Sequence, residues 1–66
     1  MDVTINGESR PLPDATTVAS LLDMLELTGK RLAVEVNEEV IPKGEHAGYS
    51  LSEGDRVEIV HAIGGG

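Results

Sequence analysis

One stretch with helical periodicity constrains the fold of this chain more than any other sequence feature. Val18, Leu21, Leu22 and Leu25 recur at positions i, i+3, i+4 and i+7, so a helix would carry them on one apolar stripe. A helix of about two to three turns is marginally stable alone and needs another element to cover that stripe. We therefore expect a helix packed across one face of a β-sheet.

Stretches with the features of β-strands surround this helix in the sequence. They comprise residues 2–6, 8–12, 32–37, 39–41 and 56–63. Between the first two, Asn6-Gly7 favours a type I′ hairpin turn, which needs a positive φ angle at both central positions. Pro11 suits an edge strand because it cannot donate a hydrogen bond to a neighbouring strand. Alternation predicts that the following side chains share the buried face: Val3, Ile5, Val34, Val36, Val57 and Ile59.

The two ends of the predicted helix carry capping signals. Thr16 or Thr17 can cap its start, because a threonine hydroxyl accepts a hydrogen bond from an otherwise unpaired first-turn N–H group. Gly29 can supply the left-handed residue that follows the last helical turn. These signals place the helix between the second and third predicted strands.

The segment before the last strand lacks any periodic pattern. Residues 43–50 contain two glycines and no apolar repeat, so we expect an irregular crossing segment. Leu51 is expected to reach back into the core. Gly54 then supplies the positive φ angle of the turn that leads into the last strand.

The order of the predicted elements indicates the fold class. A single helix across a mixed sheet buries the apolar faces of both. This order predicts an α+β fold of the ubiquitin-like β-grasp type, with a sheet of four to five strands whose first and last strands run parallel at its centre. We expect a single domain over residues 1–66, in which residues 63–66 form a flexible glycine tail.

The charge balance limits the kinds of partner that this chain can bind. Twelve carboxylates face five Lys and Arg residues, and the formal net charge is −7. Such a chain repels a phosphate backbone, and Tyr49 is its one aromatic residue, so we expect no nucleic-acid partner. We expect instead partners with basic surfaces. The sequence has no apolar leader or membrane-length apolar run, so we expect no membrane association and a cytoplasmic location.

Side chains that could perform chemistry are few. His46 and His61 are separated by fifteen positions, and neither has a second ligand at metal spacing, so we expect no metal site. His61 is more simply a strand or interface residue. Glu38 and Glu39 indicate a solvated acidic face, because nothing apolar flanks them to perturb their protonation. There is no cysteine, so any sulfur chemistry must use sulfur from elsewhere.

The three glycines at the end of the sequence form the strongest candidate site. Gly64, Gly65 and Gly66 lack the lysine and the helix that a phosphate-binding loop requires. A chain without β-carbons can pass down a narrow channel and place its terminal carboxylate in a partner's active site. A carboxylate needs activation before acyl transfer, for example as an acyl-adenylate, and no ATP-binding pocket is expected in this chain. The activating enzyme would thus be a separate protein; the simpler alternative is an idle tail.

The last strand also carries apolar residues on the face that should be exposed. Val60 and Ala62 fall on the same face as Arg56 and Glu58, just before the glycines. Together with Ile63 they are the candidate docking surface for a partner. Scattered exposed apolar residues are also common on monomers, and strand alternation alone does not separate these two interpretations.

The end of the chain resembles a known family. Residues 56–66, preceded by Glu53-Gly54-Asp55, resemble the end of the bacterial sulfur-carrier family of thiamine thiazole synthesis, the ThiS family. The resemblance extends over essentially the whole chain, and residues 34–37 and 40–43 form a second specific block. Two departures are a histidine at position 46, where family members often carry tryptophan, and three terminal glycines where many members end in two.

This resemblance implies a function and a set of partners. The carboxylate of Gly66 would be adenylated by a ThiF-type enzyme that uses ATP and magnesium, then converted to a thiocarboxylate with sulfur from a cysteine desulfurase route. A ThiG-type thiazole synthase would receive the tail and the sulfur. The chain itself would bind no cofactor and would be a carrier, not a catalyst.

Other functions fit the same fold and tail. The small subunit of molybdopterin synthase resembles this chain in fold and chemistry, although those subunits are usually longer. A ubiquitin-like modifier would form an isopeptide bond through the same terminal glycine. A β-grasp interaction module with an idle tail would need neither reaction.

Overall fold

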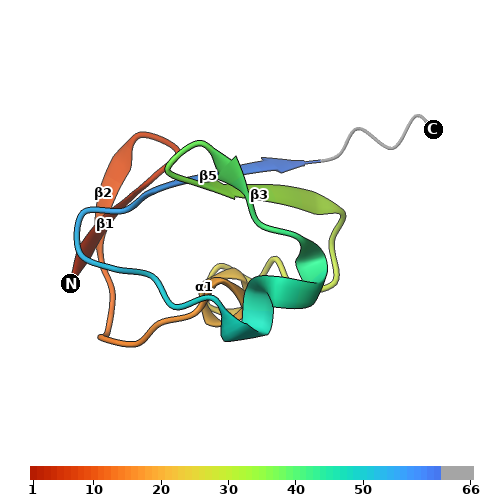
Figure 1. Ribbon diagram of the computed structural model, residues 1–66, viewed down its shortest axis with the longest axis horizontal. Coiled ribbons are helices and arrows are strands. Elements are labelled where there is room, and N and C mark those ends of the chain that lie inside the picture. The colour runs from red at the N-terminus through yellow and green to blue at the C-terminus, as the bar shows by residue number, and fades with distance from the viewer. Residues whose placement is uncertain (62–66) are drawn as a thin grey trace.

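The computed structural model of the protein describes residues 1–61. Its elements are β1 (Asp2–Ile5), β2 (Glu8–Pro11), α1 (Val18–Met24), β3 (Leu32–Val36), β4 (Glu39–Val40), the 3₁₀-helix η1 (Lys43–Gly48) and β5 (Arg56–His61). The strands form one layer, and α1 and η1 lie together on one side of it (Figure 1). Within the described part of the chain, no helix is long and apolar enough to cross a membrane.

The five strands form one mixed sheet in the order β2-β1-β5-β3-β4. β1 runs parallel to β5, whereas β1 with β2, β3 with β4 and β3 with β5 are antiparallel. The last strand therefore occupies the centre of the sheet beside the first strand. This arrangement confirms the predicted β-grasp fold, at the upper end of the expected strand number.

Both hairpins close through turns with consecutive positive φ angles. Asn6 and Gly7 have φ angles of 50° and 86° between β1 and β2, which confirms the predicted turn. Asn37 and Glu38 have φ angles of 52° and 72° between β3 and β4. The second turn has no glycine, and Asn37 is a residue type that tolerates this region of backbone space. Pro11 ends β2 at the edge of the sheet, as predicted.

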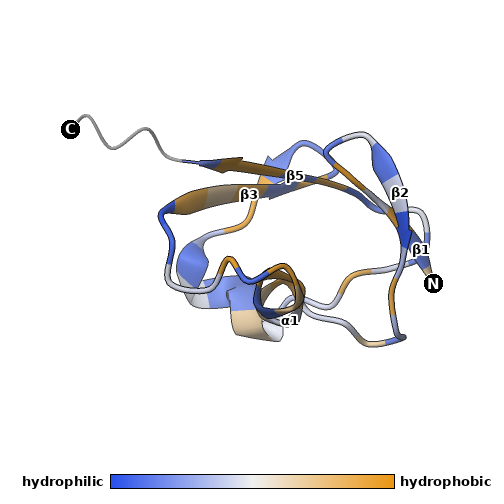
Figure 2. Ribbon diagram, turned by 180° about the vertical axis from the view of Figure 1, so that it is seen from behind, coloured by the Kyte–Doolittle hydropathy of each residue, from blue (hydrophilic) through white to orange (hydrophobic). Residues whose placement is uncertain are grey.

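The core lies between the sheet and α1. Apolar positions on β3, β5 and α1 are visible in Figure 2 as orange segments of elements that pack together. The buried apolar residues are Val3, Ile5, Leu12, Val18, Leu21, Leu22, Val34, Val36, Ile41, Leu51, Val57 and Ile59. All six strand positions predicted to share the buried face are among them, and Leu51 reaches the core as expected.

The start of α1 is capped by the second of the two candidate threonines. The side-chain oxygen of Thr17 accepts a hydrogen bond from the Ser20 backbone N–H at 3.1 Å. Thr16 is buried, and its hydroxyl donates to the Pro13 carbonyl at 2.6 Å. Thr16 thus fixes the loop that precedes the helix, and Thr17 provides a hydrogen-bond acceptor for an N–H group of the first helical turn.

The end of α1 differs from the prediction. The helix ends at Met24, and Glu26, with a φ angle of 59°, is the left-handed residue after it; Gly29 lies in the next turn instead. The Leu27 N–H donates to the Leu22 carbonyl at 2.8 Å and the Glu26 N–H donates to the Asp23 carbonyl at 3.0 Å. This pair of bonds is a Schellman motif. The helix ends before Gly29 because Leu27 packs against the core, and a continued helix would not keep this contact.

The segment predicted to be irregular contains the 3₁₀-helix η1. The Glu45 N–H donates to the Pro42 carbonyl at 2.8 Å, and His46 is the one buried residue of the element. This short 3₁₀-helix buries one side chain, so its sequence needs no apolar repeat, and the pattern did not predict it. The first four strands each end one residue earlier than predicted, although after β4 the Ile41 N–H still donates to the Val34 carbonyl at 2.9 Å.

Candidate functional site at the end of the last strand

The end of β5 is held by β3. Antiparallel pairing extends from Val36 opposite Val57 to Leu32 opposite His61, whereas the parallel pairing with β1 covers Arg56 and Val57. The second half of β5 is therefore fixed mainly from one side. β5 ends at His61, the last described residue, beside Leu32 at the start of β3 (Figure 1).

Asn37 fixes the beginning of β5. Its backbone N–H donates to the Arg56 carbonyl at 2.7 Å, and its side-chain oxygen accepts from the Arg56 N–H at 2.9 Å. Its side-chain nitrogen donates to the Asp55 carboxylate at 3.0 Å. The turn that follows β3 thus sets the register with which β5 enters the sheet.

The two faces of β5 have different environments. Val57 and Ile59 are 1% and 8% exposed, so they anchor the strand to the core. Val60 points to the opposite face, which we call the outer face of the sheet, and is 52% exposed. The structure thus places Val60 on the exposed face that the alternation predicted.

Two further apolar residues share the outer face with Val60. Ala33 is paired directly with Val60 across β3 and β5. Val40 is paired with Glu35, which is itself paired with Glu58, and Val40 is 64% exposed. Cross-strand partners lie on the same face of a sheet, so Ala33, Val40 and Val60 share the outer face with Glu35 and Glu58; we call these three apolar residues the outer-face patch. Sequence reasoning missed Ala33 and Val40, because the face that they share with Val60 depends on strand register.

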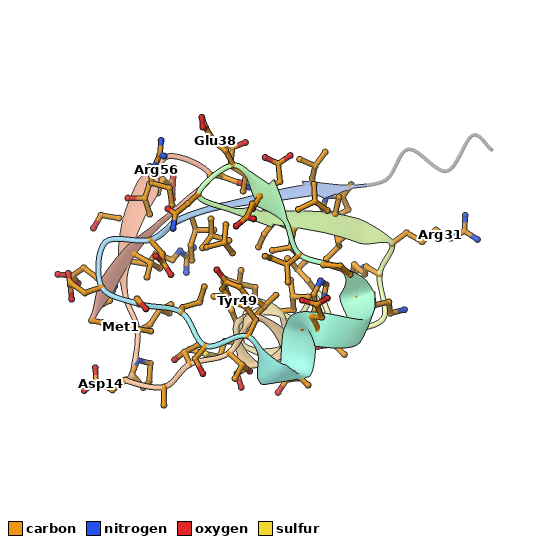
Figure 3. All side chains as sticks on the ribbon, viewed as in Figure 1. Met1, Asp14, Arg31, Glu38, Tyr49 and Arg56 are labelled. Atoms are coloured by element: carbon orange, nitrogen blue, oxygen red, sulfur yellow. The ribbon has the colours of Figure 1, made fainter. Side chains whose placement is uncertain are left out.

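Carboxylates lie beside the residues of the outer-face patch. Glu35 and Glu58 lie beside each other on β3 and β5, and Glu38 lies at the tip of the adjacent turn, with Arg56 nearby (Figure 3). Within residues 1–61, the one ion pair is between the Met1 amino group and Asp14, at 3.6 Å on a different part of the surface. The outer face therefore presents apolar side chains beside several carboxylates, which complements a basic, partly apolar partner surface.

The described residues offer little chemistry of their own at this end of the molecule. His61 is an exposed residue of β5, as expected for a strand residue. Among residues 1–61, no cluster of three or more His, Asp or Glu side chains could hold a metal ion. The other predicted site residues, Ala62, Ile63, Gly64, Gly65 and Gly66, lie outside the described residues, as does the predicted tail at 63–66.

A mixed sheet with one helix across it, and with its central last strand leading to the C-terminal residues, defines a ubiquitin-like β-grasp protein. Residues 3–66 match the sequence model of the ThiS family. The match therefore includes the three glycines that lie beyond the described part of the structure. This chain belongs to the ThiS family.

Similar proteins agree with this assignment. A crystal structure of the thiamine biosynthesis protein ThiS from Geobacter metallireducens superimposes with a TM-score of 0.87 over 100% of both chains, at 29% sequence identity. The sulfur carrier protein ThiS of Bacillus subtilis is 40% identical over 53 residues, which are 80% of each chain. A thiazole synthase of Paramagnetospirillum magneticum is 42% identical over all 66 residues, but these span only 20% of that longer protein.

Proposed function

We propose that this protein is a sulfur carrier that donates sulfur to a thiazole synthase in thiamine biosynthesis. The observation that carries the proposal is the ThiS family match, which continues from the sheet through Gly66. In the structure, β5 is a central strand of the sheet and ends at His61, five positions before Gly66 in the sequence. The folded part would then serve to present the terminal carboxylate to partner enzymes, and the chain would be a carrier, not a catalyst.

The proposed chemistry takes place on the carboxylate of Gly66. Its oxygen attacks the α-phosphorus of ATP, held with magnesium by a ThiF-type adenylating enzyme, and pyrophosphate leaves. A sulfide equivalent then attacks the acyl carbon and AMP leaves, so that one oxygen is replaced by sulfur. When the sulfur arrives as a persulfide from a cysteine desulfurase route, electrons from a thiol reductant release it. A cytoplasmic location would place the carrier with these enzymes.

Partner binding in this proposal uses the outer face and the chain end. Val60, with Ala62 and Ile63, would dock on the partner, and Ala33 and Val40 extend the same patch on the described surface. Gly64, Gly65 and Gly66 would enter the partner's channel. The similarity to part of a longer thiazole synthase supports a thiazole synthase as one partner, because joining two domains in one chain raises their effective concentration.

Intact-mass spectrometry tests the proposal directly. After incubation with ATP, magnesium, a ThiF-type enzyme and a sulfur source, the mass of the protein is expected to rise by the difference between sulfur and oxygen. Omitting ATP should abolish the change, and removing Gly66 should abolish it without unfolding the sheet. No mass change with enzymes that load an established ThiS protein would refute the proposal.

A further inference from the structure

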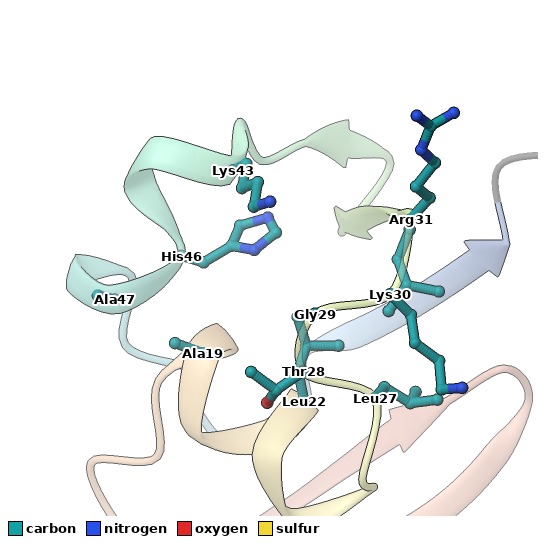
Figure 4. A pocket seen from close by; sticks show the side chains of 11 residues that line it. Ala19, Leu22, Leu27, Thr28, Gly29, Lys30, Arg31, Lys43, His46 and Ala47 are labelled. Atoms are coloured by element: carbon teal, nitrogen blue, oxygen red, sulfur yellow. The ribbon is translucent and has the colours of Figure 1, made fainter. Parts of the chain in front are cut away.

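A groove on the helical side of the molecule is separate from the outer-face patch. It has a volume of about 630 Å³ and lies between α1, the segment that enters β3, and η1 (Figure 4). Its floor is apolar and includes Leu22, Leu27 and Leu32. An open groove with such a floor is suited to receive an apolar side chain from a partner.

Cationic side chains gather around this groove, although the chain as a whole is strongly acidic. Lys30, Arg31 and Lys43 line it, and they are three of the five Lys and Arg residues of the sequence. Twelve carboxylates are available, yet no Asp or Glu of the described residues contributes to its lining. The groove is therefore locally basic on a molecule with a net charge of −7, and it complements an acidic ligand.

His46 adds a polar group to the wall of the groove. Its Nε2 lies 2.9 Å from the Ile41 carbonyl oxygen, and a carbonyl can only accept, so Nε2 carries a proton and donates this bond. The ring faces the groove with Lys43 beside it, whereas Lys30 and Arg31 extend from the opposite side (Figure 4). The apolar floor is thus bordered by cationic donors on two sides, with Lys43 on one side and Lys30 and Arg31 on the other.

The groove lies beside the end of β5, the last described strand of the chain. Leu32 is a lining residue of the groove and the cross-strand partner of His61, the last described residue of β5. Arg31 extends at the same end of the molecule (Figure 3). An enzyme that receives the C-terminal residues must approach this end, so part of its surface would come within reach of the groove.

We propose that this groove docks an acidic segment of the thiazole synthase, with one apolar side chain of that segment on the leucine floor and its carboxylates beside Lys30, Arg31 and Lys43. The proposal rests on the proposed function, because the partner is the enzyme that takes sulfur from Gly66. The groove would then be a second contact on the helical side, in addition to the outer-face patch. Because the two surfaces have opposite charge, they would also fix the orientation of the carrier on the enzyme.

Charge reversal tests the groove against a matched control. Arg31→Glu and Lys43→Glu each change the net charge by the same amount as Arg10→Glu, which lies on the edge strand β2 outside the groove. We expect each groove variant to bind the thiazole synthase about fivefold to tenfold more weakly at low salt, a difference that shrinks at high salt, whereas Arg10→Glu binds nearly as the wild type does. All three variants should keep the wild-type urea midpoint.

Cross-linking identifies what occupies the groove. The chain has no cysteine, so Ala47→Cys provides a single attachment point on the groove wall for a photo-activated cross-linker, and Asp14→Cys provides a control outside it. We expect Ala47→Cys to cross-link to a segment of the thiazole synthase that is rich in Asp and Glu, and Asp14→Cys to give no such product. Cross-links to a segment without acidic residues would overturn the proposal.

Sulfur loading, measured on the same variants by intact mass, separates this inference from the proposed function. We expect the groove variants to be loaded as well as the wild type. If the wild type is loaded and binds the synthase, but Arg31→Glu and Lys43→Glu bind equally well, the groove proposal is wrong and the carrier function stands. A further contrary outcome is that inorganic phosphate perturbs the NMR signals of the groove while the groove variants keep the wild-type affinity for the synthase. In that case the groove binds small anions and the proposal is also wrong. If the wild type is neither loaded nor bound, both proposals fail.

Discussion

The side-chain amide of Asn6 is hydrogen-bonded to both backbone polar groups of Ile59. The Ile59 N–H donates to the side-chain oxygen of Asn6 at 2.8 Å, and the side-chain nitrogen of Asn6 donates to the Ile59 carbonyl at 3.2 Å. The backbone N–H of Asn6 already donates to the Val57 carbonyl at 2.9 Å. The side chain therefore continues the ladder between β1 and β5 after the main chain of β1 has turned away, and it supports β5 on the side where β3 does not lie.

Replacing Asn6 should loosen the second half of β5. Asn6→Gly removes both side-chain hydrogen bonds but suits the φ angle of 50°, so we expect the free energy of unfolding to fall by about 1 to 3 kcal/mol. Asn6→Ala also forces a left-handed residue with a β-carbon, and we expect about 1 kcal/mol of further loss. Urea unfolding of the two variants measures both the loss of the side-chain hydrogen bonds and the further loss caused by alanine at this φ angle. A stability of Asn6→Gly equal to that of the wild type would show that the amide does not support β5.

Much of the fold follows from local sequence patterns. The alternation of apolar and polar residues predicts that Val34, Val36, Val57 and Ile59 face the core. Side chains in a strand alternate between its two faces, so a few residues are enough to show this pattern. The predicted end of α1 at Gly29 is wrong, because the end depends on the packing of Leu27 against the core and not on a glycine signal. Tertiary packing decides such boundaries, and the local sequence does not carry that information.

The candidate site was predictable only in part. The exposure of Val60 follows from its position on β5, two residues after Glu58. The proximity of Ala33 and Val40 depends on the pairing of three strands, which the sequence does not specify locally. The basic groove depends in the same way on the fold, because Lys43 lies twelve positions after Arg31 and only the packing of η1 brings them to one groove.

The cap of α1 should contribute measurably to stability, because the helix has only seven residues. Thr17→Ala removes the oxygen that accepts from the Ser20 N–H, and we expect a loss of about 1 kcal/mol in the free energy of unfolding. Thr17→Ser keeps an equivalent hydroxyl and should be nearly neutral. Thermal or urea unfolding of both variants provides the comparison, and equal stabilities of the two would argue against the cap.

Two valines of β5 offer a matched test of the core and the outer face. Val57→Ala should lower the free energy of unfolding by about 2 kcal/mol, because the side chain is 1% exposed and its loss leaves a cavity. Val60→Ala, at a side chain that is 52% exposed, should change it by less than about 0.5 kcal/mol. Urea unfolding measures both.

A charged substitution at Val60 tests whether this side chain contacts a partner. Val60→Asp should leave the fold intact yet weaken binding to the adenylating enzyme and the thiazole synthase about tenfold or more, because it places a charge in an apolar contact. Affinity is measured at one temperature with folded protein only. Unchanged affinity of Val60→Asp for both enzymes would remove Val60 from the docking surface.

His46 should be replaceable by one aromatic residue but not by another. His46→Phe removes the donor to the Ile41 carbonyl and leaves that oxygen unpaired, so we expect a loss of about 1 to 3 kcal/mol in the free energy of unfolding. His46→Trp provides an indole N–H as an alternative donor, and its larger ring has room in the adjoining groove. We therefore expect His46→Trp to be more stable than His46→Phe in urea unfolding; the reverse order would refute the role of this hydrogen bond.

The glycines at the end of the sequence should matter for transfer and not for stability. Gly65→Ala adds one β-carbon to the segment that is proposed to enter the partner's channel, and we expect sulfur loading, measured by intact mass, to fall by about a hundredfold or more, on the order expected when reacting groups are misplaced by about 1 Å. The free energy of unfolding should not change, because the buried core residues of the described part of the chain all lie within residues 3–59.

Gly44→Ala is the matched control for this glycine substitution. A β-carbon at Gly44 meets nothing within 4 Å, and the residue has no positive φ angle that would strain an alanine. Gly44→Ala should therefore be loaded at the wild-type rate. If Gly65→Ala is loaded equally fast, the missing β-carbons of the tail are not what the partner enzyme requires, and the mode of transfer proposed for Gly66 is wrong.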